Sequence, residues 1–422
     1  MIDREGAASM MQSDVDGEGG GRSVAELVVV RSGAVRSTGA ADLPWVVIDG
    51  AGVAIEPVSE FLRELLACGN GASSCRSYGY DLLRWFRFLA AVEVPWDRAQ
   101  RDEVRDFVLW LRTSDNPARV RTRPDAPSPG SINARTGKPS LSAGYAPATI
   151  NHALSVVAAF YAFHVRTGKG PIVSPVPPQS RRGGRVHAHH NPTEPFRLHK
   201  RGSYRQKQPD LPPRAVPDDV LDDTFSRLEC NRDRAMFSMF LSSGARASEL
   251  LGMSVGDACP GEGRIYVATK GLGGMKQACP AAPEAFTWLA LYLGELAGEG
   301  HRPEPDEPLW WTRRNPLRPL TYTAVRAVLR RINDSIGANI TLHDLRHTLG
   351  LRLIADPQVT LVDVQQVLRH RQVTTTGRYL RPRVDEVIAR VHEHYPRPRP
   401  RPRPLAGWTY DEQDLSDVFG VD

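Results

Sequence analysis

The chain has 422 residues, of which 41% are apolar and 24% are charged, so its composition is that of a folded soluble protein with two or three domains and excludes a wholly disordered chain. The formal net charge is +6, which fits a polyanionic partner but is weak evidence by itself. The five cysteines are widely spaced and form no C-x-x-C motif, which argues against a disulfide framework or a structural zinc site and fits a reducing cytoplasm.

The first 55 residues are predicted to form a disordered N-terminus followed by a small β arm. Residues 1 to about 22 are rich in Gly, Ser and Asp and do not resemble a signal peptide. Two β-like runs follow at 27–30 and 45–48, and the second is expected to continue through the turn D-G-A-G into a hairpin. Since no run of about 18 apolar residues occurs, we expect no membrane span.

Residues 56–175 are predicted to form a small helical domain. Apolar residues repeat at helical spacing from about Val58 onwards, most clearly at 78–89, 104–111 and 150–161. Between the last two segments, a stretch rich in Pro, Gly, Arg and Ser is predicted to be a long loop. The aromatic residues of these helices fit a core better than a stacking surface.

Residues 176–215 have the composition of a linker. From Arg181 to Lys207 there are eight Lys or Arg residues and one acid, Glu194. This segment is either a basic strap along nucleic-acid phosphates, which we favour, or a solvated linker. A metal could in principle bind its histidines, but no cysteine or carboxylate pattern supports this interpretation; they are His187, His189, His190 and His199.

A second domain is predicted over 216–395, mainly helical with a small antiparallel sheet. Pro217 and Asp218 signal a helix start, and Gly244 permits a turn after a buried helix. Two β-like runs on either side of a Gly-rich turn, from 264 to 280, form a predicted hairpin. The amphipathic segments are 286–296, 325–336, one opening at His343, 361–368 and 384–391. Residues 396–422 form a tail in which Arg and Pro alternate before several acids.

The chemistry concentrates in T-L-H-D-L-R-H-T at 341–348 and L-R-H-R-Q-V-T-T-T-G-R-Y-L at 368–380. His343 and Arg346 share a helix face, and T-T-T-G is expected to interrupt a helix and leave Tyr379 beyond a flexible joint. Cleavage of a phosphodiester needs charge on the non-bridging oxygens, a nucleophile and an acid for the leaving oxygen. No paired acids for metal ions lie near these motifs, whereas arginine forks match phosphate oxygens.

Three motifs in this order resemble the tyrosine recombinase (phage integrase) family. They are S-G-A-R-A-S-E-L around Arg246, H-D-L-R-H, and L-R-H followed by Tyr379 after eight intervening residues. The resemblance covers about 218–395 and includes a hairpin lysine, here Lys270 in T-K-G. It implies a multidomain α+β protein, with an N-terminal SAM-like helical core-binding domain and a mainly helical catalytic domain that carries a small antiparallel β-sheet.

The resemblance also implies a role for each matching residue. Tyr379 would attack DNA to give a 3′-phosphotyrosyl link, while Arg246 and Arg346 would clamp the scissile phosphate. Lys270 would protonate the leaving 5′-oxygen. His343 would act as general base or hydrogen-bond partner, and His370 would brace the phosphate. A phenol has a pKa of about 10, so the arginines would help by favouring the phenolate.

Several positions depart from the pattern or compete with it. Where the family usually has Gly, this chain has Arg369, which would either contact the phosphate or, as we slightly favour, face solvent. Lys276 competes with Lys270 for the acid role. His347 is expected to be a structural hydrogen-bonding residue rather than a catalyst. Rival tyrosines without a His at the right interval are Tyr322, Tyr395 and Tyr410.

The resemblance implies site-specific DNA recombination by an integrase or transposase of a mobile genetic element. It implies cytoplasmic DNA cleavage and rejoining with no cofactor and no metal. The partners would be double-stranded recombination sites, further copies of the chain in a homo-tetramer, and possible accessory proteins. A type IB topoisomerase or resolvase-like strand transferase is one alternative. A catalytically inactive DNA-binding protein is the other, although the intact residue set argues against it.

Overall fold

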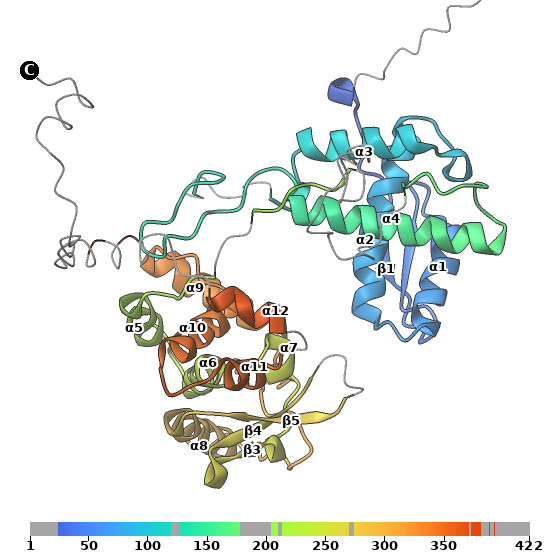
Figure 1. The fold of residues 1–422 in the computed structure, drawn as a ribbon. Helices are drawn as coiled ribbons and strands as arrows, with labels where there is room; N and C mark the ends of the chain where they lie inside the picture. Colours follow the sequence, from blue (N-terminus) through green and yellow to red (C-terminus); the bar gives the residue numbers. More distant parts are fainter. Residues whose placement is uncertain are drawn as a thin grey trace, which may run out of the picture. The chain divides into compact units, whose positions relative to one another are not determined.

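The structure, a computed structural model, describes residues 24–119, 127–177, 204–209, 213–269, 274–370 and 373–380, together with Ile388 and His392. It divides into two compact units, residues 1–210 and 211–422 (Figure 1). The histidines and most of the basic run of the linker, Lys270, the predicted helix at 384–391 apart from Ile388, and the C-terminal tail lie outside the described residues.

The first unit is built from four helices and a two-stranded ribbon within its described part. The predicted helices are confirmed, with wider bounds than the apolar stripes alone suggest. The helices are α1 (Glu56–Ala67), α2 (Ala72–Ala91), α3 (Arg101–Thr113) and α4 (Pro147–Thr167), and short 3-10 turns occur at Val24–Glu26, Trp96–Arg98 and Pro117–Arg119. The described part of the long loop between α3 and α4 carries only the last of these turns and isolated β-bridges.

Aromatic side chains fill the core of this unit, as the sequence predicts. Trp85, Phe107 and Phe160 are fully buried, and the Trp85 and Phe107 ring centroids lie 5.0 Å apart at 75°. Helix α4 is long and apolar enough to cross a membrane by length and composition. Its residues from Ile150 to His164 supply much of this core, which accounts for its apolar character.

The β arm differs from the prediction. Residues 27–30 form no strand, and Val28 and Val30 are 80% and 67% exposed. The ribbon instead pairs β1 (Ala34–Ser37) antiparallel with β2 (Trp45–Ile48). The turn after β2 does fold back, since the Asp49 amide donates to the Val53 carbonyl at 2.8 Å. Val47 packs in the helical core, so the ribbon belongs to the same unit as the helices.

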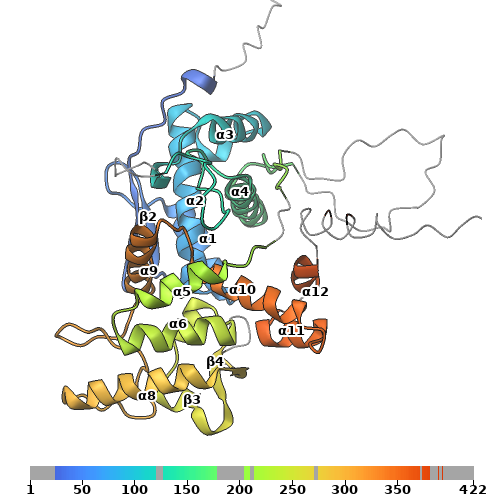
Figure 2. The ribbon, with the colours of Figure 1, turned by 90° about the vertical axis from the view of Figure 1, so that its left-hand side faces the viewer.

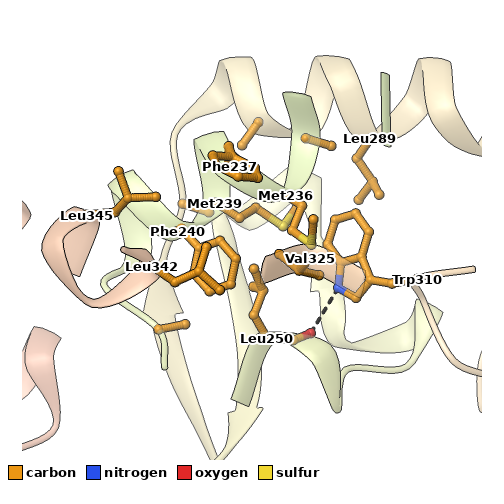
Figure 3. Close-up of a cluster of buried hydrophobic side chains, with 14 of the residues drawn as sticks. Met236, Phe237, Met239, Phe240, Leu250, Leu289, Trp310, Val325, Leu342 and Leu345 are labelled. Atoms are coloured by element: carbon orange, nitrogen blue, oxygen red, sulfur yellow. Dashed lines mark hydrogen bonds between the residues drawn. The ribbon is translucent and has the colours of Figure 1, made fainter. Parts of the chain in front are cut away.

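The second unit places α6 (Asn231–Ser243) at its centre, with α8 (Pro283–Gly298) against one side and α10 (Leu342–Ala355) against another (Figures 1 and 2). Figure 3 shows the core there, where Met236, Phe237 and Phe240 of α6 belong to the same cluster of buried side chains as Trp310. The Trp310 indole donates to the Leu250 carbonyl at 2.9 Å. The other helices are α5 (Asp218–Ser226), α7 (Ala247–Leu251), α9 (Tyr322–Ile336), α11 (Leu361–Leu368) and α12 (Val373–Thr376).

A small antiparallel sheet lies beside these helices, as predicted. Its strand order is β3 (Ala258–Cys259), β4 (Arg264–Ala268) and β5 (Lys276–Pro280). The turns at Val255–Asp257 and Pro260–Glu262 flank β3. Ala268 pairs with Lys276, so the segment that contains Lys270 connects the paired ends of β4 and β5.

The segment around Tyr379 is more ordered than the sequence predicts. The three threonines are themselves helical, since Val373–Thr376 forms α12, but the α-helix ends there and the 3-10 turn η6 (Gly377–Leu380) follows directly. Thr376 is fully buried, and its hydroxyl lies 2.9 Å from Nδ1 of His370. This contact and the packing of Tyr379 connect the segment to α11 and to His370.

Candidate active site

Arg246 enters the site through a tight helix-to-helix turn. Gly244 ends α6 with φ of +58°, and a Cβ there would lie 2.9 Å from Leu368. Arg246 then caps α7, and its backbone N–H donates to Glu249 Oε2 at 2.9 Å. The Arg246 guanidinium donates to Glu249 Oε1 at 2.5 Å while its side chain remains 37% exposed. Because of this exposure, Arg246 can reach an anion at the surface.

Arg346 is a buried residue of the H-D-L-R-H motif, and it contacts the backbone of the other two motifs. It lies on α10, is 2% exposed, and donates to the backbone carbonyls of Gly244 and Leu368. Burial, together with the charges of Arg246 and Arg369, lowers the pKa of Arg346 to about 10. The guanidinium is therefore still protonated at neutral pH. Its positive charge is desolvated, so it would attract a phosphate strongly.

His370 is held as a neutral imidazole. Burial first, and then the positive charges of Arg346 and Arg246, lower the pKa of His370 to about 4. Its ring is nearly parallel to that of Tyr379, with centroids 6.1 Å apart at 12°. A neutral imidazole can brace a phosphate by donating one hydrogen bond, but it adds no charge.

Tyr379 is buried, with its hydroxyl directed at a histidine. It is 5% exposed and packs with Val364 and Leu368 of α11. Its hydroxyl lies 2.7 Å from Nδ1 of His347, the residue that we expected to be structural. His347 does make a hydrogen bond, as predicted, but its partner is the candidate nucleophile itself.

His343 stands one turn before His347 on α10. It is exposed, and its ring centroid lies 4.2 Å from that of His347 at 69°. Tyr379, His347 and His343 therefore form a row from the interior to the surface. Either imidazole fits the general-base role that we assigned to His343 alone.

Of the two lysines that compete for the acid role, only Lys276 lies within the described residues. Lys276 on β5 directs its ammonium to Asp257 Oδ1 at 2.5 Å, and Asp257 is buried. That ion pair occupies Lys276, whereas Lys270 lies outside the described residues. Of the rival tyrosines, Tyr322 is 54% exposed on α9, and Tyr395 and Tyr410 lie outside the described residues.

Arg369 neither faces solvent nor stands at an open phosphate position, so our expectation for it was wrong. Its side chain is 3% exposed, and its guanidinium pairs with Glu249 Oε2 at 3.0 Å. Arg246, Arg346 and Arg369 thus converge around one carboxylate, Glu249. Three guanidinium groups and one carboxylate leave a net positive charge, which is the electrostatic requirement of a phosphate site.

Sequence reasoning missed Gly350 and Glu249 as contributors to the site, and it predicted a hydrogen bond for His347 without identifying Tyr379 as the partner. A signal existed for His347, because it follows His343 by four residues and shares its helix face. Gly350 also lies on α10 and makes room for the tyrosine, since a Cβ there would lie 2.9 Å from Tyr379 Cε1. Only the folded contact between α10 and η6 reveals that requirement.

Two protein-family models match the sequence of this chain. The model described as the phage integrase family matches residues 222–386, and the one for the phage integrase N-terminal SAM-like domain matches residues 58–123. The two matches together span more than half of the chain, one in each unit. The chain therefore belongs to the phage integrase family of tyrosine recombinases.

Individual relatives point the same way. Tyrosine recombinase XerD of Pseudomonas aeruginosa is 30% identical over 172 residues, which are 39% of this chain and 55% of that protein. Tyrosine recombinase XerC of Chromobacterium violaceum is 28% identical over 188 residues, 42% of this chain and 59% of that protein. The chain spans little more than half the length of the curated relatives that it matches.

Solved structures confirm the fold. The XerH site-specific recombinase bound to palindromic difH substrate is 14% identical with a TM-score of 0.52, covering 77% of this chain and 80% of that one. The Tn1549 transposon integrase in complex with a circular intermediate DNA is 14% identical with a TM-score of 0.51, covering 80% of this chain and 99% of that one. At such identities the likeness is one of fold.

Proposed function

We propose that the chain is a site-specific DNA recombinase that cuts and rejoins duplex DNA through a covalent link on Tyr379. The observation that carries this proposal is the Tyr379 hydroxyl, which lies 2.7 Å from His347 in a cluster that also holds Arg346 and His370. A nucleophile, a proton acceptor and buried positive charge are the parts that phosphodiester transfer needs.

The proposed step is balanced in atoms and charge. The Tyr379 oxygen attacks the phosphorus, the bond to the 5′-oxygen breaks, and a 3′-phosphotyrosyl link forms. The phenol proton passes to the row of histidines, His347 and His343. Lys270 gives a proton to the leaving 5′-oxygen, and the reverse reaction with another 5′-hydroxyl rejoins a strand.

The remaining residues act on the phosphate in this proposal. Arg246 and Arg346 bind the non-bridging oxygens, and His370 donates a hydrogen bond to one of them. Because Tyr379 is 5% exposed, its turn η6 has to shift outward for the hydroxyl to reach phosphorus. The bond energy kept in the phosphotyrosyl link makes an energy-rich cofactor unnecessary.

We further propose that the protein acts in the cytoplasm as a homo-tetramer on two duplex sites, with accessory proteins as possible partners. The basic linker would lie along DNA phosphates. The proposal extends to integration or transposition of a mobile element. The Tn1549 transposon integrase, whose fold this chain shares, is an enzyme of that kind by name.

Covalent trapping from a random library tests this function and finds the target duplex in the same experiment. The protein is incubated with duplexes that carry a randomised central segment next to a nick, and adducts that resist detergent are recovered and sequenced. We expect one enriched duplex with the wild-type chain and no adduct with Tyr379→Phe, which should still bind that duplex. If the wild-type chain yields no adduct, it is a DNA-binding protein without activity.

The enriched duplex then separates recombination from simple relaxation. A plasmid that carries two copies of it should give recombinant circles. Relaxation of supercoils without recombinant product would instead identify a topoisomerase.

A further inference from the structure

Arg369 occupies a backbone position that disfavours a side chain. It caps the end of α11 with φ of +52°, in the left-handed region that glycine adopts without cost. Glycine is also the residue that the family usually has there. A side chain kept in this conformation has to be stabilised by its contacts.

Those contacts tie Arg369 to two other elements of the unit. One nitrogen of its guanidinium, Nη2, donates to the Gly244 carbonyl at 3.1 Å and to Glu249 Oε2 at 3.0 Å. The other, Nη1, lies 2.7 Å from the Val367 carbonyl and 2.6 Å from Sγ of Cys279 on β5. With 3% of its side chain exposed, Arg369 cannot reach bulk solvent.

The Glu249 carboxylate is shared between two arginines. Oε1 accepts from Arg246 at 2.5 Å and Oε2 accepts from Arg369 at 3.0 Å, while the Glu249 side chain is 1% exposed. A carboxylate this deeply buried needs a cationic partner at all times. If Arg246 were that sole partner, a phosphate would have to compete with Glu249 for it.

We propose that Arg369 is a positioning residue: it remains paired with Glu249 so that Arg246 can leave this carboxylate for the scissile phosphate. The exposed fractions of the two side chains support these separate roles. Arg246, which would bind the phosphate, is 37% exposed, and Arg369, which would stay with Glu249, is 3% exposed. When the phosphate binds, Arg246 exchanges Glu249 for the phosphate. The buried Glu249 carboxylate keeps Arg369 as its cationic partner. The inference rests on the proposed function, because it concerns the same phosphate.

The first test uses Arg369→Gly, which suits the left-handed backbone and removes the second partner of Glu249. Single-turnover cleavage of the duplex recovered from the library should fall at least tenfold, with the dissociation constant for that duplex changed less than about twofold. Adding Glu249→Gln should restore the rate to within about threefold, because glutamine still accepts from the Arg246 amide but no longer holds its guanidinium. No rescue by the second substitution would overturn the proposal.

A matched control isolates the backbone effect. Glu93 is another residue with positive φ, +55°, and it is exposed in the first unit. Glu93→Gly relieves the same backbone conformation without touching the site, so cleavage should be unchanged. Arg369→Lys keeps a charge beside Glu249 and should retain at least a third of the wild-type rate. A folded Lys variant as slow as the Gly variant would contradict the proposal.

A substrate change separates positioning from structural damage. With a methylphosphonate at the scissile position, the phosphate carries no negative charge and depends less on Arg246. The tenfold loss of Arg369→Gly should shrink to about threefold or less on this duplex. An equal loss on both substrates, or no loss on either, would overturn the proposal. If the wild-type chain cleaves neither substrate, the proposed function itself fails.

Discussion

Gly350 shows how closely the site is packed at the scale of single residues. A Cβ at this position would lie 2.9 Å from Cε1 and 3.0 Å from Cζ of Tyr379, and 3.0 Å from Leu368. The helix itself would accept alanine readily, so the requirement comes from the tyrosine ring and not from α10. The sequence alone does not reveal this requirement.

We therefore predict that Gly350→Ala displaces Tyr379. Adduct formation should fall at least tenfold, and the free energy of unfolding should drop by about 1–3 kcal/mol from overpacking. DNA binding should persist. Gel shift measures DNA binding, adduct yield measures the covalent step, and urea unfolding measures stability. Gly294→Ala is the control, since nothing lies near its Cβ in α8 and stability should hold or rise. Wild-type adduct yield in Gly350→Ala would show that the ring position is unimportant.

His370 makes stability depend on pH. Its pKa is lowered to about 4 by burial and by the nearby arginines, whereas an unfolded histidine titrates at about 6.5. Between these values the unfolded chain binds a proton that the folded site does not, so acid favours unfolding. The contribution of His370 is fully present above about pH 6.5 and is lost progressively as the pH falls towards 4.

His370→Gln should remove this dependence while it retains a polar partner for Thr376. Urea unfolding at pH 7.5 and 5.0 would show the wild-type chain losing more stability than the variant, by on the order of 1 kcal/mol. Because the other histidines are common to both proteins, the difference isolates His370. Equal losses would mean that its imidazole is not held neutral.

The sequence predicted which candidate site residues lie close together better than it predicted their contacts. Arg246, Arg346, His370 and Tyr379 come together in the second unit. The shared carboxylate of Glu249 and the inward turn of Arg369 depend on the meeting of α7, α11 and β5. Spacing along the chain carries no information on that meeting.

At the scale of elements, long amphipathic helices were predictable and short segments were not. Helix α11 spans 361–368 as the pattern predicts, because its apolar stripe and its Thr360 cap agree. The run at 27–30 has strand-like residues but no partner strand within the described part of the chain, and it is irregular. Helix α12 forms despite its three threonines because Thr376 is buried against His370.

The cap of α11 gives an element-scale prediction. The Thr360 hydroxyl accepts from the Asp363 amide at 3.2 Å at the start of the helix whose other end presents Arg369 and His370. Thr360→Ala should lower the free energy of unfolding by about 0.5–2 kcal/mol. Thr287→Ala, at an exposed non-capping position of α8, should change it by less than about 0.5 kcal/mol. Urea midpoints compare the two, and equal values would argue against the cap.

At the scale of the whole molecule, the division into two units was predictable from the loss of periodicity after about 171. The structure places the boundary at 210/211, and the two family matches fall on either side of it. The predicted linker carries eight Lys or Arg between Arg181 and Lys207. We therefore expect the positive charge of this linker to contribute to the affinity of the whole chain for DNA.

Neutralising part of the linker should weaken binding in a salt-dependent manner. Changing Arg181, Arg182, Arg185, Lys200 and Arg201 to Ser should flatten the plot of log affinity against log salt by about 0.9 for each lost phosphate contact. Lys169→Ser is the control, since that lysine already pairs with Glu60 at 2.7 Å. An unchanged slope would mean that the linker is merely solvated.

The most direct test of the central claim is the location of the covalent bond. The adduct formed with the enriched duplex is digested with nuclease and protease. Mass spectrometry then locates the residue that carries a nucleotide linked through its 3′-phosphate. We predict that this nucleotide lies on Tyr379 and that Tyr379→Phe carries no such mass. A nucleotide on Tyr395 or any other residue would contradict the site described above.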